Sequence, residues 1–266
     1  MSRKLLAALM FVAVGVLKLP LEERVAAYER EVHLMEKPLS LDLREQLGQE
    51  AFAASLGGLR SLVASITYLQ AYVAFENVDW GKVDSLMTLT TRLQPREETY
   101  WDEAAWHMAY NAASYEQNYS KDRPALRNIH FHDYALRGVA ILEEGLHFLP
   151  KSYKFYSRLG EIYRDRLGEP RKASEAFLKA YALGAKDFYE RMGAYEMVKL
   201  SDRPSWEHAY QILMKHYRSG VPTASMLRDI PVLEQRLGIP PEKRIKPALQ
   251  IPPALRARIK VPGAGQ

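Results

Sequence analysis

The feature that most constrains the fold is the stretch 155–185, FYSRLGEIYRDRLGEPRKASEAFLKAYALGA. Its pattern predicts two short helices joined by a tight turn at residues 168–170, Gly-Glu-Pro. Small side chains at Gly160, Ala173 and Ala180 would allow two antiparallel helices to approach closely. Larger side chains are then expected to fill the space between the helices: Tyr156, Leu159, Tyr163 and Phe177.

The spacing within this hairpin is close to a known repeat pattern. Aromatic-x2-Leu-Gly-x2-Tyr runs from Tyr156 to Tyr163, and Ala-x3-Phe follows at Ala173 and Phe177. This pattern resembles that of the tetratricopeptide repeat family. The resemblance implies an all-α solenoid of stacked helical hairpins, in which the first helices line a concave groove that binds protein partners.

Weaker copies of the pattern are found on both sides of this hairpin. A degenerate repeat is expected at about 67–95, and a last one at about 188–222. Between them, one repeat has its second helix displaced to about 134–149 by a predicted insertion at about 115–131. The predicted domains are N-terminal helices at 22–63, tetratricopeptide-like repeats at 64–222, a capping helix at 223–238 and an extended, proline-rich basic tail at 239–266.

The N-terminal residues 1–21, MSRKLLAALMFVAVGVLKLPL, carry a targeting or anchoring pattern. Arg3 and Lys4 precede an apolar run of 13 residues, Leu5–Leu17. We interpret the segment as an uncleaved signal anchor, because no clear small-x-small cleavage site follows it. A cleaved signal peptide and a buried helix are the alternatives, since a full membrane span needs about 20 apolar residues.

The anchor interpretation predicts where the protein resides. Positive residues before the apolar run place the N-terminus in the cytoplasm and the body on the periplasmic side of the membrane. If the segment is cleaved, the protein is instead periplasmic or secreted. The apolar stretch Ala51–Phe75 is expected to be a buried helix rather than a second span, because Arg60 lies within it and a lipid-facing arginine is costly.

The net charge of +5 is concentrated at the C-terminus. Residues 239–266 hold six Lys or Arg and one acid, whereas the other 238 residues are balanced with 31 bases and 31 acids. A balanced body argues against nucleic acid as a partner. Because the tail carries six prolines, it is expected to order only against an acidic protein surface or anionic lipid headgroups. Its candidate contacts are Lys243, Arg244, Arg256 and Arg258.

Motifs for catalysis, cofactor binding and metal binding are missing from the sequence. There is no cysteine, no phosphate-binding glycine loop, no G-x-S-x-G and no H-E-x-x-H. His130 and His132 lie two apart in a segment expected to enter a helix, where such residues diverge, so a surface or capping role is favoured over a metal site. His107 and Asn111 are four apart and are expected to form a structural hydrogen bond. We expect a non-enzymatic protein without cofactor or metal.

The most informative side chains are aromatic ones on two predicted first helices. Tyr and Trp are favoured anchors at protein interfaces. When the helices are aligned on Ala71 and Ala105, the resemblance implies that five aromatic side chains face the groove. The alternative is that they are buried against the insertion or the helix at 51–63. The predicted partner-binding residues of the groove are Tyr68, Tyr72, Phe75, Trp106, Tyr110 and, from the third repeat, Arg164.

The resemblance to membrane-anchored tetratricopeptide proteins of the bacterial envelope implies a scaffold or assembly subunit. We therefore expect a non-enzymatic protein that binds subunits of a membrane-associated complex through its groove. The first alternative is a periplasmic binding module for a peptide or glycan, released after signal cleavage. An enzyme of unrecognised type is the third reading, disfavoured by the absence of catalytic motifs.

Overall fold

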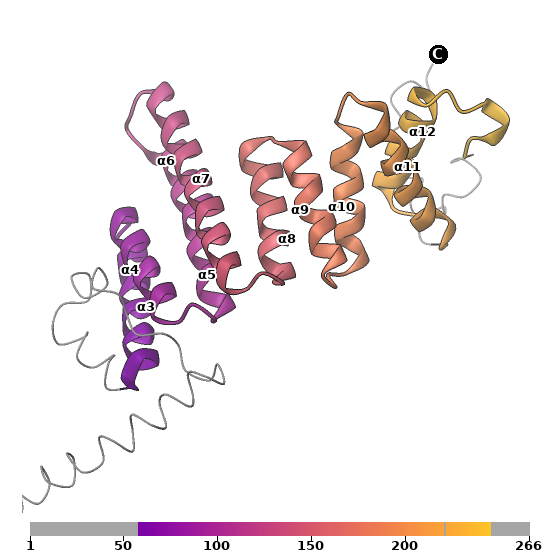
Figure 1. Ribbon diagram of the computed structural model, residues 1–266. Helices are drawn as coiled ribbons and strands as arrows, with labels where there is room; N and C mark the ends of the chain where they lie inside the picture. Colours follow the sequence, from indigo (N-terminus) through magenta and orange to yellow (C-terminus); the bar gives the residue numbers. More distant parts are fainter. Residues whose placement is uncertain (1–57, 221, 246–266) are drawn as a thin grey trace, which may run out of the picture. The chain divides into compact units, whose positions relative to one another are not determined.

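The computed structural model describes residues 58–220 and 222–245 (Figure 1). All regular elements in these ranges are helices, which confirms the predicted all-α class. None of the described helices is both long and apolar enough to cross a membrane. The predicted anchor at residues 1–21 lies outside the described residues, as do Arg256 and Arg258 of the tail.

The chain divides into two units, residues 1–63 and 64–266. Only residues 58–63 of the first unit are described, so the helical architecture below is that of the second unit. In this unit, helices that follow one another along the chain pack against each other in pairs.

The first hairpin consists of α3 (Arg60–Glu76) and α4 (Trp80–Leu93). Asp79 caps the start of α4 by accepting a hydrogen bond from a backbone N–H of its first turn. The hydroxyl groups of Thr67 and Thr90 lie 2.8 Å apart and join the two helices across a buried contact. Small side chains of α3 face this interior, whereas several large apolar side chains on its other side are exposed.

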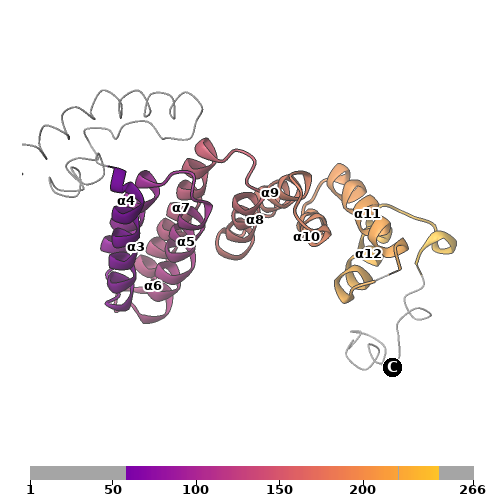
Figure 2. The same cartoon turned by 90° about the horizontal axis from the view of Figure 1, so that it is seen from below.

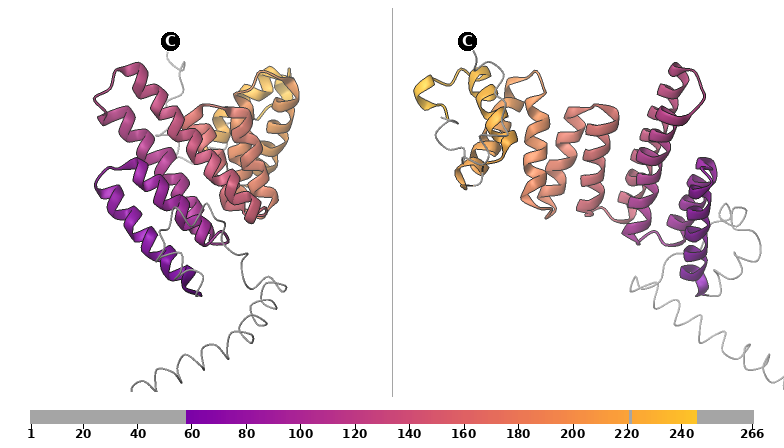
Figure 3. Two further views of the ribbon diagram at one scale, coloured as in Figure 1. Left: turned by 60° about the vertical axis from the view of Figure 1, so that its left-hand side comes forward. Right: turned by 180° about the vertical axis from the view of Figure 1, so that it is seen from behind.

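The second hairpin is longer than the sequence pattern predicts. Its first arm is a continuous helical run of α5 (Glu98–Trp106), the π-helical turn η2 (His107–Ala112) and α6 (Ala113–Tyr119). Its second arm is the long helix α7 (Pro124–Phe148), which lies alongside the first arm (Figure 3). A proline occupies the first turn of α7. Residues 115–131, expected as an insertion, therefore form the ends of these two arms and the turn between them.

The two arms of the second hairpin pack closely because small residues lie between them. A Cβ atom at Gly138 of α7 would lie 2.7 Å from the Cβ atom of Ala109 and 2.9 Å from the carbonyl oxygen of Ala105. Gly145 similarly faces the rings of Trp101 and Phe155. No larger side chain fits at Gly138 without displacing the backbone of α5.

The third hairpin is the one whose pattern is clearest in the sequence. It consists of α8 (Tyr153–Ile162), the π-helical turn η3 (Tyr163–Leu167) and α9 (Pro170–Ala182). Gly168 ends η3 in the left-handed conformation, with φ of 64°, which a glycine adopts without steric cost. A Cβ atom at Gly160 would lie 2.5 Å from the ring of the fully buried Phe177.

The chain continues with α10 (Asp187–Val198), α11 (Arg203–Arg218) and α12 (Ala224–Arg236). The helices α8 to α12 pack in chain order, each against the next (Figures 1 and 2). The segment predicted as a capping helix, 223–238, contains α12, whose first turn is capped by Thr223. One hydrophobic core lies within α3 to α9 and a second within α10 to α12.

Residues 239–245 differ from the extended conformation predicted for the tail. They form a turn that includes the short 3-10 helix η4 (Pro241–Lys243). The backbone N–H of Ile245 donates to the carboxylate of Glu234 at 2.8 Å, and Ile245 packs against the second core. This turn is held because a buried carboxylate of α12 needs a donor, and the returning chain supplies one.

Candidate functional site

The first helices of consecutive hairpins contact one another through their side chains. We call this face, made by α3, α5–η2, α8–η3 and α10, the first-helix surface. Between α3 and α5, the hydroxyl of Tyr68 donates to the carboxylate of Glu103. Between α5 and α8, the guanidinium of Arg158 lies 4.7 Å from the ring centre of Trp106. The predicted aromatic positions of the first two hairpins are therefore brought onto neighbouring helices.

The three aromatic residues of α3 differ in exposure. Tyr68 and Phe75 are half-buried, because Tyr68 packs on Tyr100 and Phe75 packs on His107, with ring centres 4.8 Å apart in the second pair. Tyr72 contacts Phe75 but remains 52% exposed. Of this group, Tyr72 is therefore the side chain that a partner could reach most readily.

Trp106 and Tyr110 form a stacked pair on α5 and η2. Their ring centres are 4.2 Å apart and the planes differ by 16°. Two arginines of the third hairpin hold the pair: Arg158 lies over Trp106, and Arg166 lies 4.2 Å from the ring centre of Tyr110. Trp106 is nevertheless 40% exposed. We call these two stacked rings the aromatic platform; the arginines hold the rings in place, and Trp106 is the ring that a partner could contact.

The alternative expectation is that these aromatic side chains are buried against residues 115–131 or against the helix at 51–63, of which residues 51–57 lie outside the described residues. Within the described ranges, Tyr115 packs on Trp80 instead, with ring centres 5.8 Å apart. Phe131 approaches the platform only through Arg166, which lies 5.8 Å from its ring centre. Burial, together with the nearby carboxylates of Asp165 and Glu161, raises the pKa of the Tyr110 phenol to about 12.

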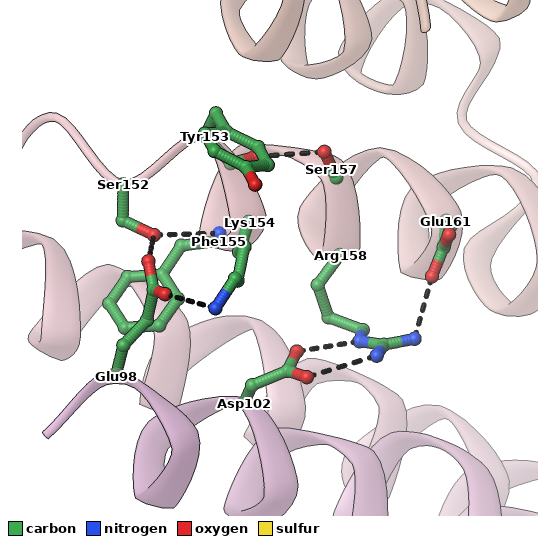
Figure 4. Close-up of polar contacts among 9 residues, drawn as sticks. All are labelled: Glu98, Asp102, Ser152, Tyr153, Lys154, Phe155, Ser157, Arg158 and Glu161. Carbon is green, nitrogen blue, oxygen red and sulfur yellow. Dashed lines mark hydrogen bonds and ion pairs between the residues drawn. The ribbon is translucent and has the colours of Figure 1, made fainter. Parts of the chain in front are cut away.

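A polar network of Asp102, Arg158 and Glu161 (Figure 4) lies next to Trp106 and continues the surface onto α8. Arg158 donates to both carboxylate oxygens of Asp102, with Nε–Oδ1 and Nη2–Oδ2 distances of 2.8 Å and 3.1 Å. Its remaining Nη1 donates to Oε2 of Glu161 at 2.7 Å. Such bidentate, charge-assisted contacts fix the orientation of a guanidinium. The network thereby joins the second and third hairpins.

A second charged contact lies at the start of α8. Ser152 caps this helix and also donates to Glu98, whose other oxygen lies 2.6 Å from Nζ of Lys154 (Figure 4). Burial alone would raise the pKa of Glu98, but hydrogen bonds from Lys154 and Ser152 outweigh it and lower the pKa. Beside this contact lies a shallow cavity of about 150 Å³ between α5, α8 and α10.

Three of the predicted charged residues are found in the described ranges. Arg164 forms an ion pair with its neighbour Asp165, lies 5.4 Å from the ring centre of Phe177, and donates from Nη1 to the sulfur of Met192 on α10 at 3.2 Å, so its guanidinium joins the third hairpin to α10. Lys243 lies in η4. Arg244 donates to the carbonyl of Ile239 within the C-terminal turn. None of these three lies in the Trp106–Arg158 network.

The histidine candidates have structural surroundings. His107 and Asn111 form the predicted contact, with 3.1 Å between the ring Nδ1 and the amide nitrogen, and burial lowers the pKa of His107. His130 lies 3.8 Å from Asp122 on the exposed start of α7. Within residues 58–220 and 222–245, no group of three potential ligands is suitably placed for a metal ion.

Sequence reasoning missed the polar half of this surface. Asp102 and Arg158 are 56 positions apart, and no local spacing indicates that they meet. Glu161 is three residues after Arg158, which is an ordinary helical pairing and therefore carries little functional information. The only available signal was that both lie on first helices of adjacent predicted repeats.

Comparison with known proteins provides no relative for this chain. No family model, curated protein or solved structure matches it.

Proposed function

We propose that this chain is a tetratricopeptide-like repeat protein whose first-helix surface binds a segment of a protein partner. The consecutive helical hairpins and their glycine-mediated contacts support the repeat assignment. We propose further that the partner belongs to a membrane-associated complex, on the strength of the apolar run Leu5–Leu17 and the basic residues before it.

The observation that carries the proposal is the Trp106–Tyr110 platform. Its rings are held by arginines of the next hairpin, so little side-chain freedom is left to lose when a partner binds. Trp106 and Tyr72 are both substantially exposed although they are large and apolar. Rigid, accessible aromatic side chains are typical energetic centres of protein interfaces.

The test is to replace both exposed aromatic residues, Tyr72→Ala with Trp106→Ala, in the full chain. Tagged protein is extracted with detergent from the membranes of its native host, and the co-purifying chains are compared by mass spectrometry. We expect the double variant to lose specific partners that the unaltered chain retains. Tyr119→Ala is the matched control, because Tyr119 is 73% exposed on α6 and lies outside the first-helix surface.

Thermal unfolding of the same variants separates binding from folding. Because Tyr72 is 52% exposed and Trp106 40% exposed, the double variant should lose less stability than a core substitution and unfold within a few degrees of the unaltered chain. Retention of all partners by a folded double variant would overturn the docking proposal. A large loss of thermal stability would instead show that the two aromatic residues belong to the core.

Membrane attachment is tested separately. We expect the full chain to remain with membranes through a high-salt wash and to require detergent for release. Deletion of residues 1–20 should give a helical domain that stays in the aqueous fraction. Release of the full chain by salt alone would contradict the anchor.

A further inference from the structure

The cavity between α5, α8 and α10 adjoins the aromatic platform through Arg158. Its walls come from the first helices of three consecutive hairpins, which contribute Asp102, Arg158, Glu161 and Tyr189. Tyr153 and Lys154 close the side near the start of α8. A volume of about 150 Å³ matches one long amino-acid side chain rather than a cofactor or a folded element.

The two cations of the cavity are already bound to carboxylates. Arg158 uses Nε and Nη2 for Asp102 and Nη1 for Glu161. Nζ of Lys154 lies 2.6 Å from Glu98. An anionic ligand would have to compete with these three carboxylates for positive charge, and it would be repelled by them.

The acceptors of the cavity, in contrast, are not fully used. Glu161 binds Arg158 through Oε2 alone, and within the described residues its Oε1 accepts no hydrogen bond. Tyr153 and Tyr189 also line the cavity, each with a phenol ring and a hydroxyl group. These three oxygen atoms and two phenol rings suit a ligand that is rich in donors and positively charged.

The charges in and beside the cavity point in the same direction. Among the lining residues Asp102 and Glu161 balance Lys154 and Arg158, and Glu98, which lies beside the cavity and binds Lys154, brings the carboxylates to three against two cations. Burial raises the pKa of Glu161 although Arg158 and Arg164 act to lower it, so its ionised form is incompletely compensated by its surroundings. A further cation beside Oε1 would supply the missing compensation.

We propose that this cavity binds the side chain of an arginine or lysine from the partner segment that docks on the first-helix surface. The inference rests on the proposed function, and it adds the chemistry of the partner. A basic residue would occupy the cavity while a neighbouring apolar residue of the same segment contacts Trp106. Because Arg158 touches both the cavity and Trp106, the two contacts are expected within a few residues of each other in the partner.

The experiment titrates the full chain in detergent with N-acetyl-arginine amide and follows backbone amide resonances of α8 and α10 by NMR. N-acetyl-citrulline amide is the matched probe, since it has the same shape without the charge. N-acetyl-glutamate amide tests for an anion site. We expect saturable shifts with the arginine compound and binding at least about tenfold weaker with the other two, as for loss of one charge-assisted contact.

Glu161→Gln preserves the shape of the cavity and removes its uncompensated charge. We expect this variant to bind the arginine compound about tenfold more weakly, whereas Glu175→Gln, an exposed position on α9, should bind it as the unaltered chain does. Equal binding of the citrulline compound, stronger binding of the glutamate compound, or no shift at all would overturn the cation site.

Co-purification distinguishes this inference from the proposed function. If Glu161→Gln keeps every partner that Tyr72→Ala with Trp106→Ala loses, the cavity takes no part in docking and the inference fails while the proposed function stands. If the aromatic double variant keeps its partners, the proposed function itself fails, whatever the titration shows. Reduced partner recovery with Glu161→Gln, together with the expected titration, supports both.

Discussion

The second and third hairpins both bring two helices together at a glycine, but the glycines face different atoms. Gly160 of α8 faces the ring of Phe177, a side chain. Gly138 of α7 faces the Cβ atom of Ala109 and the backbone carbonyl of Ala105. In the third hairpin, a large ring therefore fills the space between the two helices. In the second hairpin, the two helix backbones approach each other directly.

This difference explains why the third hairpin is easier to recognise from the amino-acid sequence than the second. A gap filled by one aromatic ring needs a particular small residue and a particular large residue at fixed spacing, which is a readable pattern. A backbone contact needs only a row of small residues, and Ala105, Ala109 and Ala112 are also ordinary helix formers.

Phe177→Ala should have the largest effect. Phe177 is fully buried, and its removal leaves a cavity between α8 and α9 next to Gly160. We expect the free energy of unfolding to fall by about 3–5 kcal/mol. Urea denaturation followed by circular dichroism measures it, with Phe148→Ala as a control because Phe148 is half-exposed. A loss no greater than that of the control would show that the ring does not hold the hairpin together.

Gly160→Ala and Gly138→Ala should each destabilise the fold by about 1–3 kcal/mol through overpacking. The two substitutions should differ in whether a second substitution nearby restores the lost stability. Phe177→Leu removes part of the ring that a new Cβ at Gly160 would meet, so the double variant should lose less than the sum of the single losses. Ala109→Gly cannot relieve Gly138→Ala in the same way, because the carbonyl of Ala105 stays in place. Equal relief in both double-mutant cycles would remove the distinction between the hairpins.

The smallest effect concerns the contact that joins α3 to α5. A hydrogen bond to Glu103 raises the pKa of Tyr68 to about 12. Since the folded state holds the protonated phenol, this contact contributes stability below the unfolded pKa of about 10 and loses it as the pH rises towards 12. In an alkaline titration of phenolate absorbance, Tyr68→Phe should remove a tyrosine that ionises late. If the missing signal falls near pH 10 instead, Tyr68 does not make this bond in solution.

The parts of the fold that the sequence predicted are those encoded by local spacing. The all-helical class and the turn at Gly168 follow from residues close together in the chain. The long second hairpin does not, because residues 115–131 lack the apolar periodicity of a core-facing helix and extend helices begun elsewhere. Likewise, the turn at 239–245 depends on Glu234, a tertiary contact that proline content does not reveal.

The candidate site, like the fold, has some features that the sequence indicates and others that only the tertiary structure reveals. The resemblance to tetratricopeptide repeats singled out Tyr72 and Trp106, and both side chains are exposed in the structure. The partners of Trp106 could not be suggested, since Arg158 reaches it from another hairpin. The cavity requires three hairpins to be assembled, so nothing short of the tertiary structure indicates it.

The exposure of Trp106 also gives the chain a built-in optical reporter. Trp80 and Trp101 are buried and Trp206 is half-buried, so Trp106 is the tryptophan most open to water. Its emission should lie to the red of the other three, and an aqueous quencher such as iodide should reach it first. A segment that settles on the first-helix surface would shift that emission and shield it, so docking can be followed with no added dye.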